Sequence, residues 1–177
     1  MDPINIIIGL NIIATFGANV GAAKKGIKDK VGVFKDKPKT YLQTLPLVLS
    51  TVALVVLIVS LFQIGTLEYK TDYQTIRVIG LAFYIVFSWV QIWSTKTLGD
   101  NFSQDIAIKK EHHIVTNGPF KIIRHPQYLS QFLMDLGGAA ATLSFILAPL
   151  ALIQIPFLFI RASMEHKLLE KHFGERF

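Results

Sequence analysis

The chain has 177 residues, of which 51% are hydrophobic, and its mean hydropathy is +0.45. It carries a formal net charge of +6 and no cysteine, so disulfides and thiolate metal ligands are excluded. Residues 40–67 and 78–95 contain no charged side chain, and each run approaches the roughly 20 apolar residues that cross a bilayer. We therefore predict a small polytopic membrane protein. No aromatic-interleaved basic surface accompanies the positive charge, so we expect no nucleic-acid partner.

The first apolar segment, residues 4–23, is predicted to be a membrane helix that is retained. Asp2 precedes it, and the segment has neither the basic start nor an obvious cleavage site of a signal peptide. Gly17 and Gly21 lie one turn apart, as in the small-residue faces on which membrane helices pack closely. We expect this face to contact neighbouring helices of the same chain. A homo-oligomer formed through the same face is the alternative.

The charge of the loops predicts the orientation of the chain in the membrane. Residues 24–40 contain seven lysines and two aspartates, which gives a sum of +5. The connection at 65–77 contains two acidic and two basic residues, which cancel. The positive-inside rule therefore places the 24–40 loop and the C-terminus in the cytoplasm and the N-terminus outside. The basic loop either attracts anionic membrane lipids or only fixes the orientation.

The predicted fold class is all-α, a polytopic membrane protein with five transmembrane helices and a C-terminal amphipathic helix. The last crossing is short, so Arg161 must snorkel or be buried in protein. From residue 161 onward, the spacing of apolar residues and the number of charged residues are typical of a helix that lies at the membrane interface. The predicted crossings are residues 4–23, 41–64, 78–95, 126–145 and 150–160, followed by the amphipathic helix at 161–177.

The crossing at 126–145 carries a line of polar and small residues. Spacings of three and four place these residues on one helix face, which must point away from lipid. They are Tyr128, Gln131, Asp135, Gly138 and Thr142. An acidic residue inside a membrane is costly, so Asp135 either belongs to a site or hydrated cavity or pairs with a neighbouring helix. The small residues at 137–141 allow another helix to come close, and the uncharged connection at 144–149 predicts a tight hairpin.

The stretch 117–128 combines turn signals, cations, an imidazole and a phenol. Gly118-Pro119 is a turn signal, and Pro126 suits the first position of a new helix. The first turn of that helix presents unpaired N–H groups and the positive end of the helix dipole, which favour a carboxylate or phosphate. An ordinary helix start flanked by snorkelling basic residues is the other interpretation. The long connection at 96–124 that leads into this stretch is interpreted as functional.

Several other kinds of active site are not favoured by the sequence. No glycine-rich strand-to-helix fingerprint of a dinucleotide-binding domain is present. No serine lies in a nucleophile elbow. The five histidines form no HExxH pattern, and adjacent histidines on a basic loop are usually surface residues, so we expect no metal.

Short motifs in the C-terminal half carry a resemblance to a known family. They are Leu98-Gly99, the run from His113 to Phe120, the run from Arg124 to Tyr128, and Arg161 with Glu165 ahead of Phe173-Gly174. In these motifs the chain resembles the isoprenylcysteine carboxyl methyltransferase family of integral membrane enzymes and the related phospholipid methyltransferases. The resemblance implies methyl transfer from S-adenosylmethionine to a lipid-linked acceptor, typically the carboxylate of a prenylated cysteine, with S-adenosylhomocysteine as product.

The resemblance also implies roles for regions and residues. The apolar runs predict three N-terminal transmembrane helices in residues 1–95, and the resemblance implies that residues 96–177 form a catalytic region with a cytoplasmic cofactor-binding part, the hairpin of the fourth and fifth helices and the C-terminal helix. Arg161 would be the catalytic residue that faces the acceptor. The positions implied to bind the cofactor are His112, His113, Ile114, Val115, Gly118, Phe120, His125, Pro126, Gln127, Tyr128 and Glu165.

Three departures from the family pattern leave the acceptor open. Phe120 stands where many relatives have tyrosine, Ser130 replaces a frequent glycine, and His166 follows Glu165 where a second acidic residue is common. A phospholipid amine or a small thiol is therefore an alternative acceptor. Two other classes stay open: an NADPH-dependent membrane sterol reductase, and a non-enzymatic membrane packing protein in which Arg161 and Glu165 form only a helix-stabilising ion pair.

Overall fold

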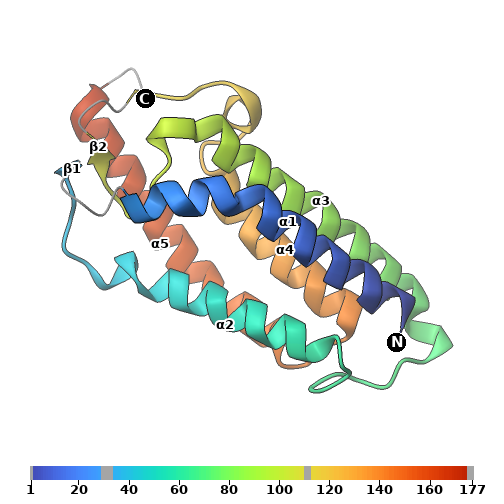
Figure 1. The fold of residues 1–177 in the computed structure, drawn as a ribbon. Helices are drawn as coiled ribbons and strands as arrows, with labels where there is room; N and C mark the ends of the chain where they lie inside the picture. The colour runs from blue at the N-terminus through green and yellow to red at the C-terminus, as the bar shows by residue number, and fades with distance from the viewer. Residues whose placement is uncertain (1, 29–33, 110–112, 175–177) are drawn as a thin grey trace.

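The computed structural model describes residues 2–28, 34–109 and 113–174. Within these ranges the chain is mostly helical, and its long helices run up and down in one bundle (Figure 1). They are α1 (Pro3–Lys28), α2 (Leu45–Ser60), α3 (Gln74–Leu98), α4 (Pro126–Thr142) and α5 (Leu147–Phe173). The shorter elements are the 3-10 helices η1 (Tyr41–Gln43), η2 (Thr71–Tyr73), η3 (Gly99–Asn101) and η4 (Gly118–Lys121), and the strands β1 (Phe34–Asp36) and β2 (Ile108–Lys109).

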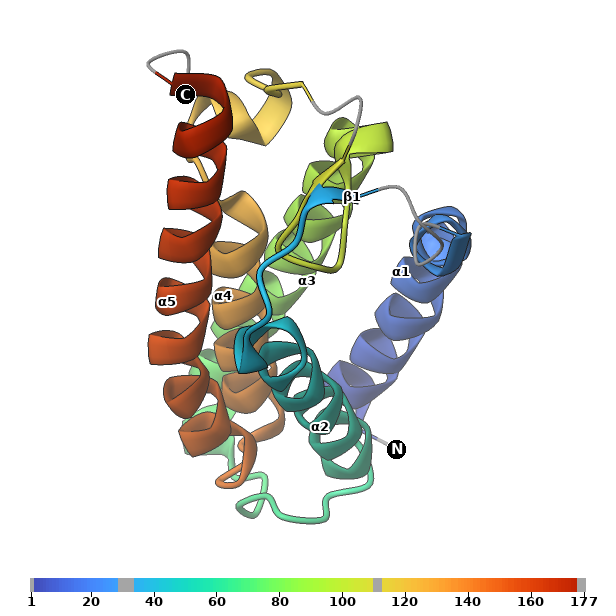
Figure 2. The ribbon, with the colours of Figure 1, turned by 90° about the vertical axis from the view of Figure 1, so that its left-hand side faces the viewer.

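The strands β1 and β2 pair as a small antiparallel ribbon, which the all-α prediction did not include. The ribbon lies at one end of the bundle, near the start of α4 and the end of α5, and we call this the ribbon end (Figures 1 and 2). The N-terminus and the α2–α3 and α4–α5 connections lie at the opposite end, which we call the hairpin end. The two ends hold the two main groups of polar side chains described below.

The outer surfaces of the helices are apolar. Phe16 is 73% exposed and Phe159 is 72% exposed, as expected of side chains that face lipid. Among the described residues, four helical segments are long and apolar enough to cross a membrane, so the chain is an integral membrane protein. They are Pro3–Val20, Tyr41–Ser60, Thr71–Asn101 and Leu147–Phe173. Helix α4, with 17 residues, is not among the four, and the fifth crossing stays a prediction.

Helix α5 runs without interruption from Leu147 to Phe173, which corrects the prediction of a short crossing followed by a separate amphipathic helix. Pro156 lies inside the helix and removes one backbone donor without ending it. The helix ends at Gly174, whose φ of +61° is a conformation that favours glycine. Arg161 and Leu168 are buried in the continued helix, so of the two alternatives for Arg161 the structure shows burial in protein.

Helices α3 and α4 approach closely through facing glycines. A Cβ atom at Gly80 would lie 2.6 Å from the Ala141 nitrogen and 2.8 Å from the Gly137 carbonyl oxygen. A Cβ at Gly137 would lie 2.6 Å from the Tyr84 nitrogen. All of these neighbours are backbone atoms, which cannot move aside as a side chain can. The predicted close approach at the small residues of α4 is therefore confirmed, and α3 is the partner helix.

Helix α1 contacts α3 through polar side chains rather than through its glycine face. Asn11 Nδ2 donates to Ser88 Oγ at 2.9 Å, and Trp89 Nε1 donates to Asn11 Oδ1 at 3.0 Å. A Cβ at Gly17 would meet nothing within 4 Å, so the expectation that this face packs on the chain's own helices is wrong at Gly17. The surroundings of Gly21 lie outside the described part of the chain.

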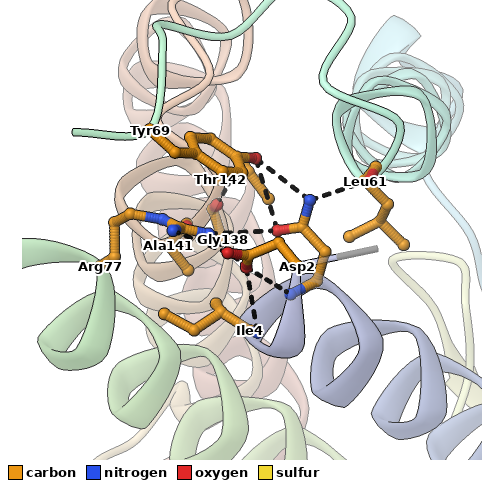
Figure 3. A network of polar contacts seen from close by, with 9 residues as sticks. Asp2, Ile4, Leu61, Tyr69, Arg77, Gly138, Ala141 and Thr142 are labelled. Carbon is orange, nitrogen blue, oxygen red and sulfur yellow. Dashed lines mark hydrogen bonds and ion pairs between the residues drawn. The ribbon is translucent and has the colours of Figure 1, made fainter. Parts of the chain in front are cut away.

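A buried arginine organises the hairpin end (Figure 3). Arg77 is 2% exposed and donates to the two carboxylate oxygens of Asp2, at 2.6 and 3.1 Å, and to the Ala141 carbonyl at 3.0 Å. Its guanidinium lies 3.7 Å from the centroid of the Tyr69 ring. Hydrogen bonds from Arg77 hold the pKa of the Asp2 carboxyl below its usual range. The backbone N–H of Asn5 also donates to Asp2, so the network joins α1, α3 and α4.

Asp135, for which a site and a helix-pairing role were both open, is hydrogen-bonded inside the bundle. Its Oδ2 accepts from Gln131 Nε2 at 2.8 Å and from Gln154 Nε2 at 3.0 Å. Gln91 Nε2 donates in turn to Gln131 Oε1 at 2.8 Å. These bonds connect α4 to α3 and α5 through neutral amides, so the structure favours the helix-pairing role.

Candidate active site

A cavity of about 240 Å³ opens at the ribbon end, between the end of α3, the start of α4 and the end of α5. Loop residues 103–108 and 113–116 form its remaining walls. We call it the first cavity. Its lining is Leu98, Asn101, Ser103, Asp105, Ala107, Ile108, His113, Ile114, Val115, Thr116, Phe120, Arg124, His125, Pro126, Gln127, Tyr128, Glu165, Leu168 and Leu169.

The first cavity brings together most of the residues predicted to bind the cofactor. Those that line it are His113, Ile114, Val115, Phe120, His125, Pro126, Gln127, Tyr128 and Glu165. Gly118 is not among the lining residues. Its φ is +57°, and a Cβ there would lie 2.9 Å from Thr97 Oγ1, so glycine serves the turn and its packing on α3. His112 lies outside the described residues, and Arg161 lines a different cavity.

Tyr128, Arg161 and Glu165 form a hydrogen-bonded group between α4 and α5. The Tyr128 hydroxyl donates to Glu165 Oε1 and accepts from Arg161 Nε at 2.8 Å. Arg161 Nε lies 3.8 Å from the same Glu165 oxygen, one helical turn away. The resemblance implies that Tyr128 and Glu165 bind the same cofactor, and these contacts show that the two side chains lie together. The phenol of Tyr128 is held between a cation and a carboxylate.

Arg161 is 6% exposed and is held mainly by the protein itself. Nη1 donates to the Leu42 carbonyl at 3.1 Å, and Nη2 donates to the Gln104 carbonyl. Together with the bond to Tyr128, these contacts engage three of the five N–H donors of the guanidinium. Arg161 thus joins α5 to η1 and to the loop after α3, and it retains donors for a ligand.

His125 immediately precedes α4 and stacks on Tyr128, with ring centroids 5.9 Å apart. Its Nδ1 lies 3.7 Å from Glu165 Oε2. Burial, together with the nearby His166 and Arg124, lowers the pKa of His125 to about 4. The imidazole is therefore neutral at pH 7, and its contact with Glu165 is not an ion pair at that pH.

Asn101 is a buried residue of the first cavity that the sequence analysis did not single out. The His113 backbone N–H donates to Asn101 Oδ1 at 3.1 Å, which fixes the orientation of the amide. Asn101 Nδ2 lies 3.0 Å from His113 Nε2. Because an amide nitrogen only donates, Nε2 accepts and the neutral ring carries its proton on Nδ1. The polar cluster after Gly99 was the available signal, but it is equally typical of a surface loop.

A second cavity of about 300 Å³ adjoins the first. Ser103, Gln127 and Tyr128 line both cavities, and Arg161 lines the second. Residues of all five long helices contribute to the second cavity, which extends among the membrane-spanning segments. Its lining is Asn19, Pro46, Leu47, Ser50, Gln91, Thr95, Phe102, Ser103, Gln104, Gln127, Tyr128, Gln131, Leu158 and Arg161.

These features define a helical integral membrane protein with two cavities that meet at Tyr128, in a Tyr–Arg–Glu group whose arginine is buried. The model of the isoprenylcysteine carboxyl methyltransferase (ICMT) family matches residues 78–171, which is more than half of the chain. The protein therefore belongs to the ICMT family, and the resemblance in its motifs is confirmed. Membership makes it a membrane methyltransferase. A search of the curated proteins finds no match.

Proposed function

We propose that the protein transfers the methyl group of S-adenosylmethionine to a lipid-linked carboxylate, that of a prenylated cysteine. The observation that carries this proposal is the shared wall of the two cavities. Gln127 and Tyr128 line both, so a ligand in each cavity would meet the other at Tyr128. The first cavity opens at the ribbon end, and the second lies among the membrane-spanning helices, which suits a soluble donor and a lipid-borne acceptor.

The residues of the first cavity fit S-adenosylmethionine, which supplies an electrophilic methyl group when bound. The first turn of α4, beginning at Pro126, has N–H groups and a helix dipole that suit the amino-acid carboxylate. The Glu165 carboxylate can accept hydrogen bonds from ribose hydroxyls or from the ammonium group. Phe120 and the neutral His125 offer flat rings for the adenine or the sulfonium.

The chemistry on the acceptor side requires little from the protein beyond placement. A carboxylate is ionised at neutral pH, so methylation of its oxygen needs no general base. The donors that Arg161 retains can hold the acceptor carboxylate, and the three contacts of Arg161 with the protein fix the guanidinium in place. Alignment of the two reactants and exclusion of water at Tyr128 would supply most of the rate.

The lining of the second cavity favours an acceptor with hydrogen-bonding groups next to its carboxylate. Six of its residues carry neutral amides or hydroxyls and lie outside the wall shared with the first cavity: Asn19, Ser50, Gln91, Thr95, Gln104 and Gln131. Gln91 and Gln131 already bond to one another, but a donor or acceptor that a ligand leaves without a partner inside a membrane costs free energy. The peptide bond that precedes a C-terminal prenylcysteine can pair with such groups, whereas a plain fatty acid cannot.

The orientation of the molecule follows from charge. The described parts of the basic segment, residues 24–28 and 34–40, lie at the ribbon end, and the charges of residues 65–77 at the hairpin end sum to zero. We therefore infer that the ribbon end and the first cavity face the cytoplasm and that α4 also crosses the membrane, which gives five crossings and leaves the N-terminus outside.

Calorimetric titration of the detergent-purified protein with S-adenosylhomocysteine tests the cofactor assignment. We expect binding of S-adenosylhomocysteine and none of NADPH. We also expect this binding to be lost in Glu165→Ala and in His125→Ala while both variants stay folded. Binding of NADPH instead, or unaltered affinity in both variants, refutes the assignment. Incubation with labelled cofactor and either N-acetyl-S-farnesylcysteine, phosphatidylethanolamine or a small thiol then identifies the acceptor.

A further inference from the structure

The described part of the linker between α1 and α2, residues 34–44, precedes the segment matched by the family model, yet it contacts a loop that lines the first cavity. Gln43, the last residue of η1, carries the most specific contact. Its Nε2 donates to the Ile106 carbonyl at 3.0 Å, and its Oε1 accepts from the Ile106 N–H at 2.8 Å. The same Nε2 donates to the Pro38 carbonyl at 2.9 Å. The amide of Gln43 thus pairs with both backbone groups of one residue, as a neighbouring strand would.

Ile106 lies at the centre of the loop that forms one wall of the first cavity. Its side chain is completely buried and packs with Leu42, Ile108 and Leu168. The neighbouring residues Asp105, Ala107 and Ile108 line the cavity. The carbonyl of Gln104, two residues before Ile106, accepts a hydrogen bond from Arg161 Nη2. A shift of this loop would therefore change both the wall of the first cavity and the position of the Arg161 guanidinium.

Besides the pairing of β1 with β2 at Ile108, the linker forms two ion pairs at the ribbon end. Lys37 Nζ lies 2.7 Å from Asp105 Oδ2 in the wall, and Lys171 Nζ of α5 lies 3.0 Å from Asp36 Oδ2. These ion pairs are solvent-exposed, and such pairs contribute about 0–1 kcal/mol each. Loss of the Gln43 amide differs in kind, because it would leave the N–H and the carbonyl of a buried residue without partners.

We propose that residues 34–44 of the α1–α2 linker support the cofactor site and that Gln43 is their positioning residue. Gln43 touches neither the cofactor nor the acceptor; it holds the 104–108 wall so that the first cavity and Arg161 keep their geometry. This inference rests on the proposed function for its consequence in cofactor binding. Its geometric part, the immobilisation of residues 104–108, can be measured without any ligand.

The test compares three variants. Gln43→Met keeps the length of the side chain and removes its hydrogen bonds, whereas Gln43→Glu keeps an acceptor for the Ile106 N–H. Gln74→Ala, at an exposed position at the start of α3 on the hairpin end, is the matched control. We expect S-adenosylhomocysteine to bind about tenfold more weakly to Gln43→Met, with an intermediate loss in Gln43→Glu and none in Gln74→Ala. Titrations run well below each variant's unfolding midpoint, so lost stability alone would leave the affinity unchanged.

Amide hydrogen exchange without ligand provides the second measurement. We expect faster exchange at residues 105–108 in Gln43→Met than in the wild type, and no change there in Gln74→Ala. Unchanged exchange at these residues, or wild-type affinity in both Gln43 variants, overturns the inference. If the wild type does not bind S-adenosylhomocysteine, the proposed function fails, and the exchange result still decides whether Gln43 holds the wall. If Gln43→Met does not fold, Gln43→Glu supplies both measurements.

Discussion

The two ends of the bundle use buried arginines in different ways. At the hairpin end, Arg77 donates to a carboxylate and a backbone carbonyl and covers an aromatic ring, in a network that borders neither of the two cavities. At the ribbon end, Arg161 is tied to two carbonyls and to Tyr128 but also faces a cavity. A buried cation therefore indicates a site only when the structure leaves space beside it. The Arg77 network stabilises the fold, whereas the Arg161 group can also bind a reactant.

The largest effect is expected at Arg161. Arg161→Leu should reduce methyl transfer about 1000-fold, because it removes the donors that would hold the acceptor and releases Tyr128. Arg161→Lys should restore little activity, since one ammonium cannot reach three separate acceptors in the way that a planar guanidinium does. Incorporation of labelled methyl into the acceptor measures both. Near-normal activity in Arg161→Lys would show that charge alone is enough.

The corresponding change at the hairpin end should affect stability rather than cofactor binding. Arg77→Leu removes the partner of Asp2 and should lower the free energy of unfolding by about 2–3 kcal/mol. The folded fraction should bind S-adenosylhomocysteine as the wild type does. Denaturant titration in detergent measures the loss, and the double variant Asp2→Asn/Arg77→Leu should recover part of it. A weakened cofactor affinity at full folding would contradict the separation of the two ends.

Two glycine substitutions compare a packed helix face with an open one. Gly80→Ala should destabilise the protein by about 1–3 kcal/mol, because the added Cβ meets backbone atoms of α4. Gly17→Ala should be neutral or stabilising by up to about 1 kcal/mol, since alanine favours helix and no atom lies within 4 Å of the new Cβ. Thermal unfolding of both variants in the same detergent provides the comparison. Equal losses would show that Gly17 is covered in solution.

The contrast between the ends also explains what the sequence could predict. Local patterns predict the apolar helices and the start of α4 at Pro126. The family motifs place Tyr128 and Glu165 in one site, where the structure shows them in contact. The charge of Arg77 was counted only as part of a loop, because its partner Asp2 lies 75 residues earlier. Local patterns do not contain such distant contacts.

The same limit explains the error at α5. The change in period and polarity after residue 160 predicted a separate amphipathic helix, and Arg161 was expected either to snorkel or to be buried in protein. Its actual partners are main-chain carbonyls of Leu42 and Gln104, which are distant in sequence and carry no side-chain signal. The role of Gln43 could not be predicted from the sequence for the same reason, since its partners are backbone groups of Ile106. A glutamine in a loop does not by itself indicate such pairing.

The smallest predicted effect is a dependence of stability on pH through His125. With a native pKa of about 4 and an ordinary value of 6.5, the unfolded chain binds a proton at this residue before the folded protein does. Stability should therefore be unaffected by His125 above about pH 7 and should fall as the pH drops through 6.5 toward 4, by about 1 kcal/mol at pH 6. His125→Gln, which cannot titrate, should remove this part of the pH dependence when denaturant midpoints are compared at pH 7.5 and 6. An identical slope in wild type and variant would show that the ring at the start of α4 is not held in its neutral form.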